Sequence, residues 1–208
     1  MTNFDEAAWW GDCANTFHEE QKQLVYARHM GLDLDWSGAH PPTIDLGGCS
    51  VVDIGGGPVS LLLKCDAAPW TRTVVDPSAW PAWVEARYEA HGITLLQERG
   101  EDMGDGEHSR FSAEEVWIYN VLQHVDDPEL VVKNALAAAR SMVRIFEWID
   151  VPPYPGHPHM LTAHALASWI GSPKFRGGQD VGPYEGVHYG DIDEDGAVGR
   201  AFFGAFGV

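Results

Sequence analysis

The chain has 208 residues, and its 31 acidic side chains outnumber its 13 lysines and arginines, which gives a formal charge of −18 with histidine neutral. A surface this negative repels phosphate backbones and anionic lipid headgroups, and no two of the cations are adjacent in the sequence. These features exclude nucleic acid polymers and membranes as expected partners. The hydrophobic content of 45% is enough for one sizeable core.

Three widely spaced cysteines, Cys13, Cys49 and Cys65, fit reduced thiols better than a disulfide framework or a zinc site. The first residues are acidic and lack the positive and apolar regions of a secretion signal, and no run approaches the ~20 apolar residues of a membrane span. We therefore expect a soluble, cytoplasmic protein with no bound metal.

Taken in chain order, the first predicted element is a helix over residues 17–30. It begins at the capping-box pattern Thr16-x-x-Glu19 and directs Phe17, Leu24 and Ala27 towards one side. Short β-branched runs that alternate with helical patterns then predict parallel strands. The five predicted strands cover residues 50–54, 73–76, 93–97, 115–120 and 142–148.

The remaining elements complete an α/β fold. Asp127 as a cap, Pro128 in the first turn and Glu129 near the start predict a helix between the last two strands. Four prolines in residues 152–158 predict a stiff connection, which leads to a short helix over 161–170. Aromatic runs around residues 191–196 predict a hairpin at the sheet edge. The predicted architecture is a doubly wound, mostly parallel Rossmann-like sheet with a C-terminal antiparallel hairpin and an N-terminal helical lid.

The strongest local pattern is VVDIGGGPVS at residues 51–60, a strand that breaks into Gly55, Gly56 and Gly57 and enters a helix near Pro58. Glycine lets the main chain approach a ligand closely, and the free N–H groups of a helix start can receive an anionic group. Ligands of open parallel sheets bind at this edge. The pattern therefore predicts a ligand site after the first strand of the sheet.

Polar side chains follow the next strands in the same way. Asp76 lies 23 residues beyond Asp53, where a carboxylate can accept hydrogen bonds from both hydroxyls of a ribose. Glu101 and Asp102 follow the third strand, where an acceptor can read the exocyclic amine of adenine. Asn120 ends the fourth strand. This series of polar residues predicts a nucleoside-binding site at the carboxyl edge of the sheet.

In this order and spacing, the segments VVDIGGGPVS, TVVDPS, GEDM, EEVWIYNVLQHVDDP and RIFEWIDV resemble the class I S-adenosylmethionine-dependent methyltransferase family over roughly residues 49–151. The resemblance implies S-adenosylmethionine as cofactor and S-adenosylhomocysteine as its product. It also implies that Gly55 and Gly57 line the methionine part, that Asp53 orders its amino group, and that Asp76 holds the ribose. Further cofactor contacts are implied for Gly56, Pro77, Glu101, Asp102, Asn120, Val121 and, from a leader similar to a lid segment, Trp10.

The resemblance implies a single methyltransferase domain over residues 1–208. Its expected parts are a helical lid (1–45), a cofactor-binding core (46–151), and a substrate-side helix with the terminal hairpin (152–208). The acidic charge and short inserts favour a small neutral or cationic acceptor with an O or N nucleophile. Histidine suits removal of the acceptor proton at neutral pH. His124, after the fourth strand, and His159, in the proline-rich connection, are the candidate bases.

Two other functions stay open. The first is a domain that binds S-adenosylmethionine as a sensor or interaction module without turnover. The second is an NAD-dependent oxidoreductase, because Gly55-x-Gly57-x-x-Ser60 approximates G-x-G-x-x-G and Asp76 follows about 20 residues later. Against it, Ser60 replaces the third glycine, Pro58 interrupts the phosphate turn, and Asp53 would place a carboxylate beside a pyrophosphate. A P-loop is excluded because no Gly-Lys-Ser/Thr follows the glycines.

Overall fold

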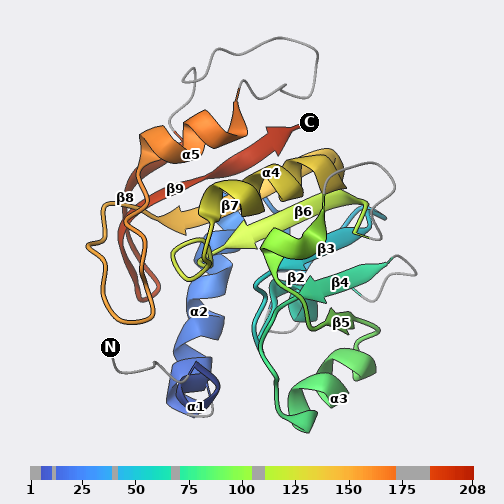
Figure 1. Ribbon diagram of the computed structural model, residues 1–208. Helices are drawn as coiled ribbons and strands as arrows, with labels where there is room; N and C mark the ends of the chain where they lie inside the picture. Colours follow the sequence, from blue (N-terminus) through green and yellow to red (C-terminus); the bar gives the residue numbers. More distant parts are fainter. Residues whose placement is uncertain (1–5, 11–12, 39–41, 67–70, 105–110, 172–187) are drawn as a thin grey trace.

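A seven-stranded sheet forms the centre of the computed structural model, which describes residues 6–10, 13–38, 42–66, 71–104, 111–171 and 188–208 (Figure 1). The strand order is β5-β4-β3-β6-β7-β9-β8, and β1 (Leu34–Asp35) and β2 (Thr43–Ile44) form a separate pair. The sheet strands are β3 (Val51–Ile54), β4 (Arg72–Val75), β5 (Thr94–Leu96), β6 (Ala113–Tyr119), β7 (Ala139–Trp148), β8 (Tyr189–Glu194) and β9 (Ala197–Gly207).

Strands β3 to β7 are parallel, whereas β9 pairs antiparallel with both β7 and β8. The structure therefore confirms the mostly parallel sheet and the C-terminal antiparallel hairpin. Each predicted strand lies within three residues of its observed bounds. The first residues of the predicted hairpin, 184–187, lie outside the described residues, and residues 191–194 belong to β8 rather than to the turn.

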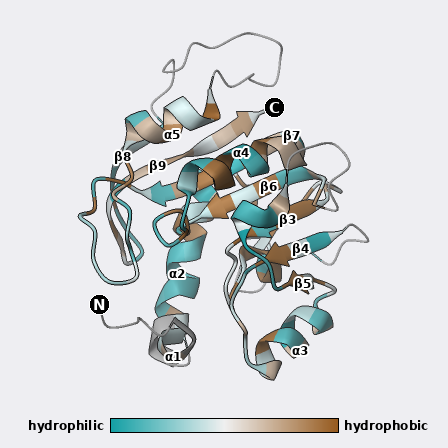
Figure 2. Cartoon of the chain, in the orientation of Figure 1, coloured by the Kyte–Doolittle hydropathy of each residue, from teal (hydrophilic) through white to brown (hydrophobic). Residues whose placement is uncertain are grey.

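Helices cover both faces of the sheet (Figure 1). One face packs against α4 (Pro128–Ala138) and α5 (Ala163–Ile170), with Val52, Ile118 and Val132 among the buried residues. The other face packs against α2 (Cys13–His29) and α3 (Ala82–Ala90), with Tyr26 and Trp117 in its core. Figure 2 shows apolar residues in β3 and β4 and hydrophilic residues on α2 and α3. Strands buried on both faces read as continuous apolar runs, which is why the sequence predicted them well.

The residues at its start also predicted the helix that follows β6. The Asp127 side chain accepts a hydrogen bond from the Leu130 amide at 3.0 Å, and Pro128 is the first helical residue. This confirms the predicted cap. A short helix, α5, follows the proline-rich connection as expected and is capped by Thr162. None of the described helices has both the length and the apolar character needed to cross a lipid bilayer.

The N-terminal helix differs from the prediction. Helix α2 begins at Cys13 rather than at a Thr16 cap, and the Thr16 hydroxyl instead donates to the Trp10 carbonyl at the end of α1 (Glu6–Trp10). Phe17, expected to face inward, is 57% exposed, whereas Tyr26 and Met30 are fully buried against the sheet. The capping-box prediction is therefore wrong, and α2 belongs to the core.

The helix expected to begin near Pro58 is also absent. The chain forms one 3-10 turn, η1 (Leu61–Lys64), capped by the Ser60 side chain. Leu61 and Leu62 pack in the same buried cluster as α2, which covers this part of the sheet instead. The prediction that a helix start supplies N–H groups for an anion is therefore wrong.

Candidate functional site

A cavity of about 740 Å³ opens at the carboxyl edge of β3, β4 and β6. This is the edge at which open parallel sheets bind ligands, and the volume lies within the ~300–1,000 Å³ typical of ligand pockets. Nine of the predicted site residues line the cavity: Trp10, Gly55, Gly56, Gly57, Asp76, Pro77, Glu101, Asn120 and Val121. The predicted base His124 lines it as well. Asp53, Asp102 and His159 do not form its wall.

The three glycines have different roles in the wall. A Cβ on Gly55 would lie 2.1 Å from Val121 Cγ2, and one on Gly56 would lie 2.7 Å from Asp53 Oδ2. Gly57 has a φ of +58°, and a Cβ built there meets nothing within 4 Å. Packing within the protein therefore requires glycine at 55 and 56, while Gly57 leaves its backbone open to the cavity.

Asp53 is fully buried beneath this loop. Its Oδ2 atom accepts hydrogen bonds from Ser60 Oγ and Tyr119 OH, both at 2.5 Å. Its Oδ1 atom is buried and has no hydrogen-bond partner among the described residues. Burial raises the pKa of Asp53 to about 7, although the two hydroxyls oppose the shift.

Buried side chains from α2, α3 and β6 hold the backbone of the loop. Tyr88 OH donates to the Gly57 carbonyl at 2.5 Å and accepts from the Ser60 amide at 3.1 Å. Tyr119 OH accepts from the Leu61 amide at 2.9 Å, and Gln23 Nε2 donates to the Val59 carbonyl at 2.5 Å. These side chains were not among the predicted site residues. The pattern of apolar residues in a helix or strand does not show where a tyrosine hydroxyl points.

Asp76 lies at the end of β4 and is 5% exposed. Its Oδ2 atom accepts from the Gly57 amide at 3.1 Å, and its Oδ1 atom accepts from the Ser78 amide at 2.9 Å and from Trp80 Nε1 at 3.0 Å. The carboxylate thus links the glycine loop to the turn after β4. Its place on the cavity wall agrees with the position predicted for a ribose acceptor.

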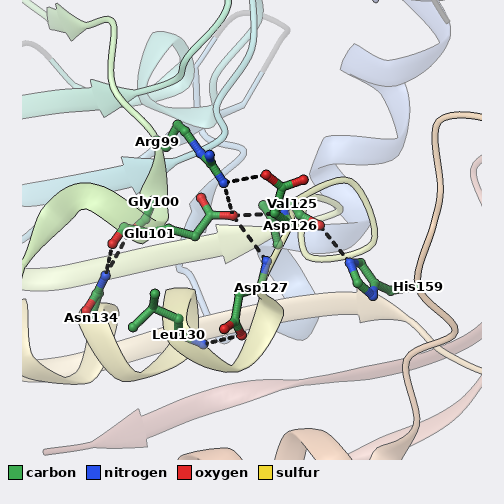
Figure 3. Close-up of polar contacts among 9 residues, drawn as sticks. All are labelled: Arg99, Gly100, Glu101, Val125, Asp126, Asp127, Leu130, Asn134 and His159. Atoms are coloured by element: carbon green, nitrogen blue, oxygen red, sulfur yellow. Dashed lines mark hydrogen bonds and ion pairs between the residues drawn. The ribbon is translucent and has the colours of Figure 1, made fainter. Parts of the chain in front are cut away.

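Glu101 and Asp102 separate in the structure, within the 3-10 turn η2 (Gly100–Met103). Glu101 lines the cavity, and its Oε1 atom accepts from the Asp126 and Asp127 amides at 2.8 and 3.2 Å and pairs with Arg99 at 3.0 Å (Figure 3). Partial burial alone would raise the pKa of Glu101, but the hydrogen bonds outweigh it, so the pKa lies below its ordinary value. Asp102 is exposed and lies off the wall.

The loop after β6 has a constrained backbone. Asn120 has a φ of +54°, and its side chain accepts from Gln123 Nε2 at 2.9 Å and donates to Glu19 at 3.3 Å. Glu147 lies fully buried behind the loop, where its Oε1 atom accepts from the Val121 and Leu122 amides at 2.9 and 3.0 Å. Burial raises the pKa of Glu147 to about 8. A left-handed non-glycine residue held by its surroundings is typical of functional loops.

The histidines do not converge as expected. His124 lines the cavity, its Nδ1 atom donates to the Gly156 carbonyl at 2.8 Å, and burial lowers its pKa. His159 instead donates from Nε2 to the Val125 carbonyl at 2.8 Å and lies off the wall (Figure 3). His157 takes its place on the wall, with its ring centroid 4.1 Å from that of His124. The predicted placement of His159 at the cavity is thus corrected, because its ring is held on the Val125 carbonyl and does not form part of the wall.

Comparison with known proteins rests on structure. No protein-family model and no curated protein matches the sequence. The chain superposes on magnesium protoporphyrin IX methyltransferase from Synechocystis PCC 6803, solved with bound S-adenosylhomocysteine, at a TM-score of 0.58 and 12% identity over 96% of this chain and 91% of that one. It also superposes on 1,6-didemethyltoxoflavin-N1-methyltransferase from Burkholderia thailandensis at 0.56 and 13%, over 95% and 81% of the two chains.

The chain has the class I methyltransferase fold. The cyclase SpnF shares this fold at a TM-score of 0.52 and 13% identity, over 72% of this chain and 55% of that chain, so the chain spans about half of the cyclase. A fold that serves both transferases and a cyclase does not determine the reaction. The reaction has to be argued from the cavity.

Proposed function

We propose that the chain is an S-adenosylmethionine-dependent methyltransferase that acts on the O or N nucleophile of a small molecule. The observation that carries the proposal is that Gly57, Asp76 and Asn120 line one cavity, each within three residues of the end of a different parallel strand. The two methyltransferase neighbours, whose names give a porphyrin and a toxoflavin precursor as acceptors, support it.

The residues around the cavity fit the proposed cofactor. The open backbone at Gly57 leaves room for the methionine part, and the unpaired Asp53 Oδ1 beneath the loop is an acceptor for its amino group, directly or through water. Asp76 carries the charged acceptor for the ribose hydroxyls. Glu101 is the candidate for adenine. Apolar wall comes from Pro77, Val121 and Trp10.

The bound cofactor would supply a methyl group on a positively charged sulfur. The chain then has to hold the acceptor in line and exclude water. His124 is the proposed proton acceptor, because its Nδ1 proton is donated to Gly156 and its Nε2 atom is therefore left with a lone pair. Its lowered pKa keeps the ring neutral near pH 7, as a base requires.

Residues 1–45, 46–151 and 152–208 are proposed to act as parts of one domain, with the first part covering the cofactor through Trp9 and Trp10 at the cavity. We further propose a reducing compartment such as the cytoplasm, which the buried thiol of Cys65 supports.

Ligand binding and turnover test the proposal separately. Thermal shift and calorimetry with S-adenosylmethionine, S-adenosylhomocysteine and NAD should show binding of the two sulfur compounds, and a ligand at 100 times its dissociation constant should add about 2.7 kcal/mol of stability. A shift with NAD alone would refute the proposal. Binding without transfer of a labelled methyl group to any small molecule of a cell extract would favour the sensor alternative.

A further inference from the structure

Three aromatic rings line the cavity and are not among the proposed cofactor contacts. We call them the ring wall, and they belong to Trp148, Tyr154 and His157. The Tyr154 and His157 rings stack with centroids 4.1 Å apart and an interplanar angle of 29°. The end of β7 and the connection that follows it thus present flat aromatic surfaces to the cavity.

Packing behind the ring wall fixes part of it in place. The Trp148 ring lies so close to β9 that a Cβ on Gly199 would be 3.1 Å from it, and the rings of Phe146 and Tyr26 contact it edge-on, with centroids 5.1 and 6.3 Å away. The Tyr154 hydroxyl is 3.0 Å from His157 Nε2. A preformed flat surface binds a flat ligand with little loss of side-chain freedom.

Both cations of the described cavity wall are paired with carboxylates. Lys22 and Glu19 of α2, both on the wall, pair at 2.6 Å. Arg99 pairs with Glu101 and with Asp126 at 2.7 Å. Asp76 adds a fourth carboxylate to the wall, so its described acidic groups outnumber its cations. The described wall therefore offers no unpaired cation to a carboxylate or phosphate, which disfavours an anionic ligand.

One hydrogen-bond acceptor faces this region. His124 contacts the ring wall through His157, and its Nδ1 proton is already donated to Gly156, so its Nε2 atom can accept a proton from a ligand hydroxyl. Burial lowers the pKa of both histidines, which keeps the two adjacent rings neutral.

From the ring wall, the paired cations and the free imidazole nitrogen, we infer that the methyl acceptor is a planar aromatic compound without negative charge, whose hydroxyl donates to His124 Nε2. The inference deepens the proposed function and rests on it, because the same cavity must also hold the methyl donor.

Probe binding to the protein saturated with S-adenosylhomocysteine tests the inference without knowledge of the natural acceptor. Ligand-observed NMR should show 1-naphthol binding about ten-fold or more tighter than decahydro-1-naphthol, which has the hydroxyl but no flat ring. It should also bind tighter than 1-naphthoate, which is anionic. Equal binding of the flat and saturated alcohols, tighter binding of 1-naphthoate, or no binding of 1-naphthol would overturn the inference.

Variants of the cavity wall test where 1-naphthol binds. Tyr154→Ala should weaken 1-naphthol about five-fold or more, whereas Tyr154→Phe should restore it, because the ring surface is kept. His124→Phe should weaken it about ten-fold through loss of the hydroxyl acceptor, with affinity for S-adenosylhomocysteine unchanged. Trp83→Ala is the matched control, since Trp83 is 48% exposed on α3 and lies off the cavity wall. Equal effects of Tyr154→Ala and Trp83→Ala would place the probe elsewhere.

Failure of the proposed function gives a different result. A wild-type protein that does not bind S-adenosylhomocysteine would overturn the proposed function and the inference together. A protein that binds S-adenosylhomocysteine but does not select the flat alcohol would overturn the inference alone.

Discussion

Tyr88→Phe removes one hydroxyl from beneath the glycine loop and leaves the ring in place. The wild-type hydroxyl makes two hydrogen bonds, to the Gly57 carbonyl at 2.5 Å and from the Ser60 amide at 3.1 Å. Tyr88 is 1% exposed, so water cannot replace the lost hydroxyl without a structural change. The variant therefore leaves two backbone groups buried without a partner.

The expected loss follows from these two groups. A buried donor or acceptor that loses its partner costs about 1–3 kcal/mol, so the loss of two partners in Tyr88→Phe should lower the free energy of unfolding by roughly 2–6 kcal/mol. For a chain of this size, 1 kcal/mol corresponds to about 2–4 °C, which gives a fall in melting temperature of roughly 4–24 °C. Affinity for S-adenosylhomocysteine should fall as well, because Gly57 and Asp76 share a hydrogen bond in the same loop.

Tyr26→Phe is the matched control. Tyr26 is equally buried, and its hydroxyl interacts with the side chains of Glu19 and Trp148. Tyr26→Phe therefore removes a buried hydroxyl without removing a partner of the glycine-loop backbone, so it should lower stability less than Tyr88→Phe. Scanning calorimetry measures both variants, and hydrogen exchange should be faster at the Ser60 amide in Tyr88→Phe alone. Equal melting temperatures for the two variants, or unchanged exchange at Ser60, would refute the assigned role of Tyr88.

Three further predictions concern the cavity and the buried acids. Asp76→Ala should weaken S-adenosylhomocysteine about ten-fold to a hundred-fold by calorimetry, because hydrogen bonds to a charged acceptor contribute roughly 1.5–3 kcal/mol; unchanged affinity would place the ribose elsewhere. Gly55→Ala should lower the melting temperature more than Gly57→Ala, since only the Gly55 Cβ would clash with Val121. The free energy of unfolding should fall as pH rises from 4.5 to about 8, because native Glu147 retains a proton that the unfolded chain releases. Glu147→Gln should reduce this dependence of stability on pH, and the raised pKa of Asp53 should leave part of it in the variant. An identical pH profile in wild type and variant would contradict the claim that burial raises the pKa of Glu147.

Local patterns predicted the elements whose cause is local. The strands β3 to β7 are short apolar runs because both of their faces are covered, and the Asp127 cap depends only on residues within one helical turn. The row of polar residues after the strands was predictable for the same reason, since parallel strands end at one edge. Their exact contacts remain proposals for binding experiments.

The errors share a different cause, which is packing between distant segments. The helix near Pro58 does not form, because Leu61 and Leu62 are buried with residues of α2, more than 30 positions earlier in the chain. His157 and His159 are two residues apart around a proline, and only the tertiary structure places the first ring on the wall and bonds the second to the Val125 carbonyl. No pattern within a short window contains that information.

No α-helix follows β3 directly in the described part of the chain, and α2 therefore supports the glycine loop in addition to lining the cavity. A glycine loop that opens towards a ligand needs its backbone groups satisfied from behind, and a helix would normally provide this through its own hydrogen bonds. Here Tyr88, Tyr119 and Gln23 satisfy them from three other elements. Because Gln23 lies on α2 beside Glu19 and Lys22 of the cavity wall, the same helix supports the glycine loop and lines the proposed acceptor region. Cofactor site and acceptor site are thereby joined through one element at the start of the chain.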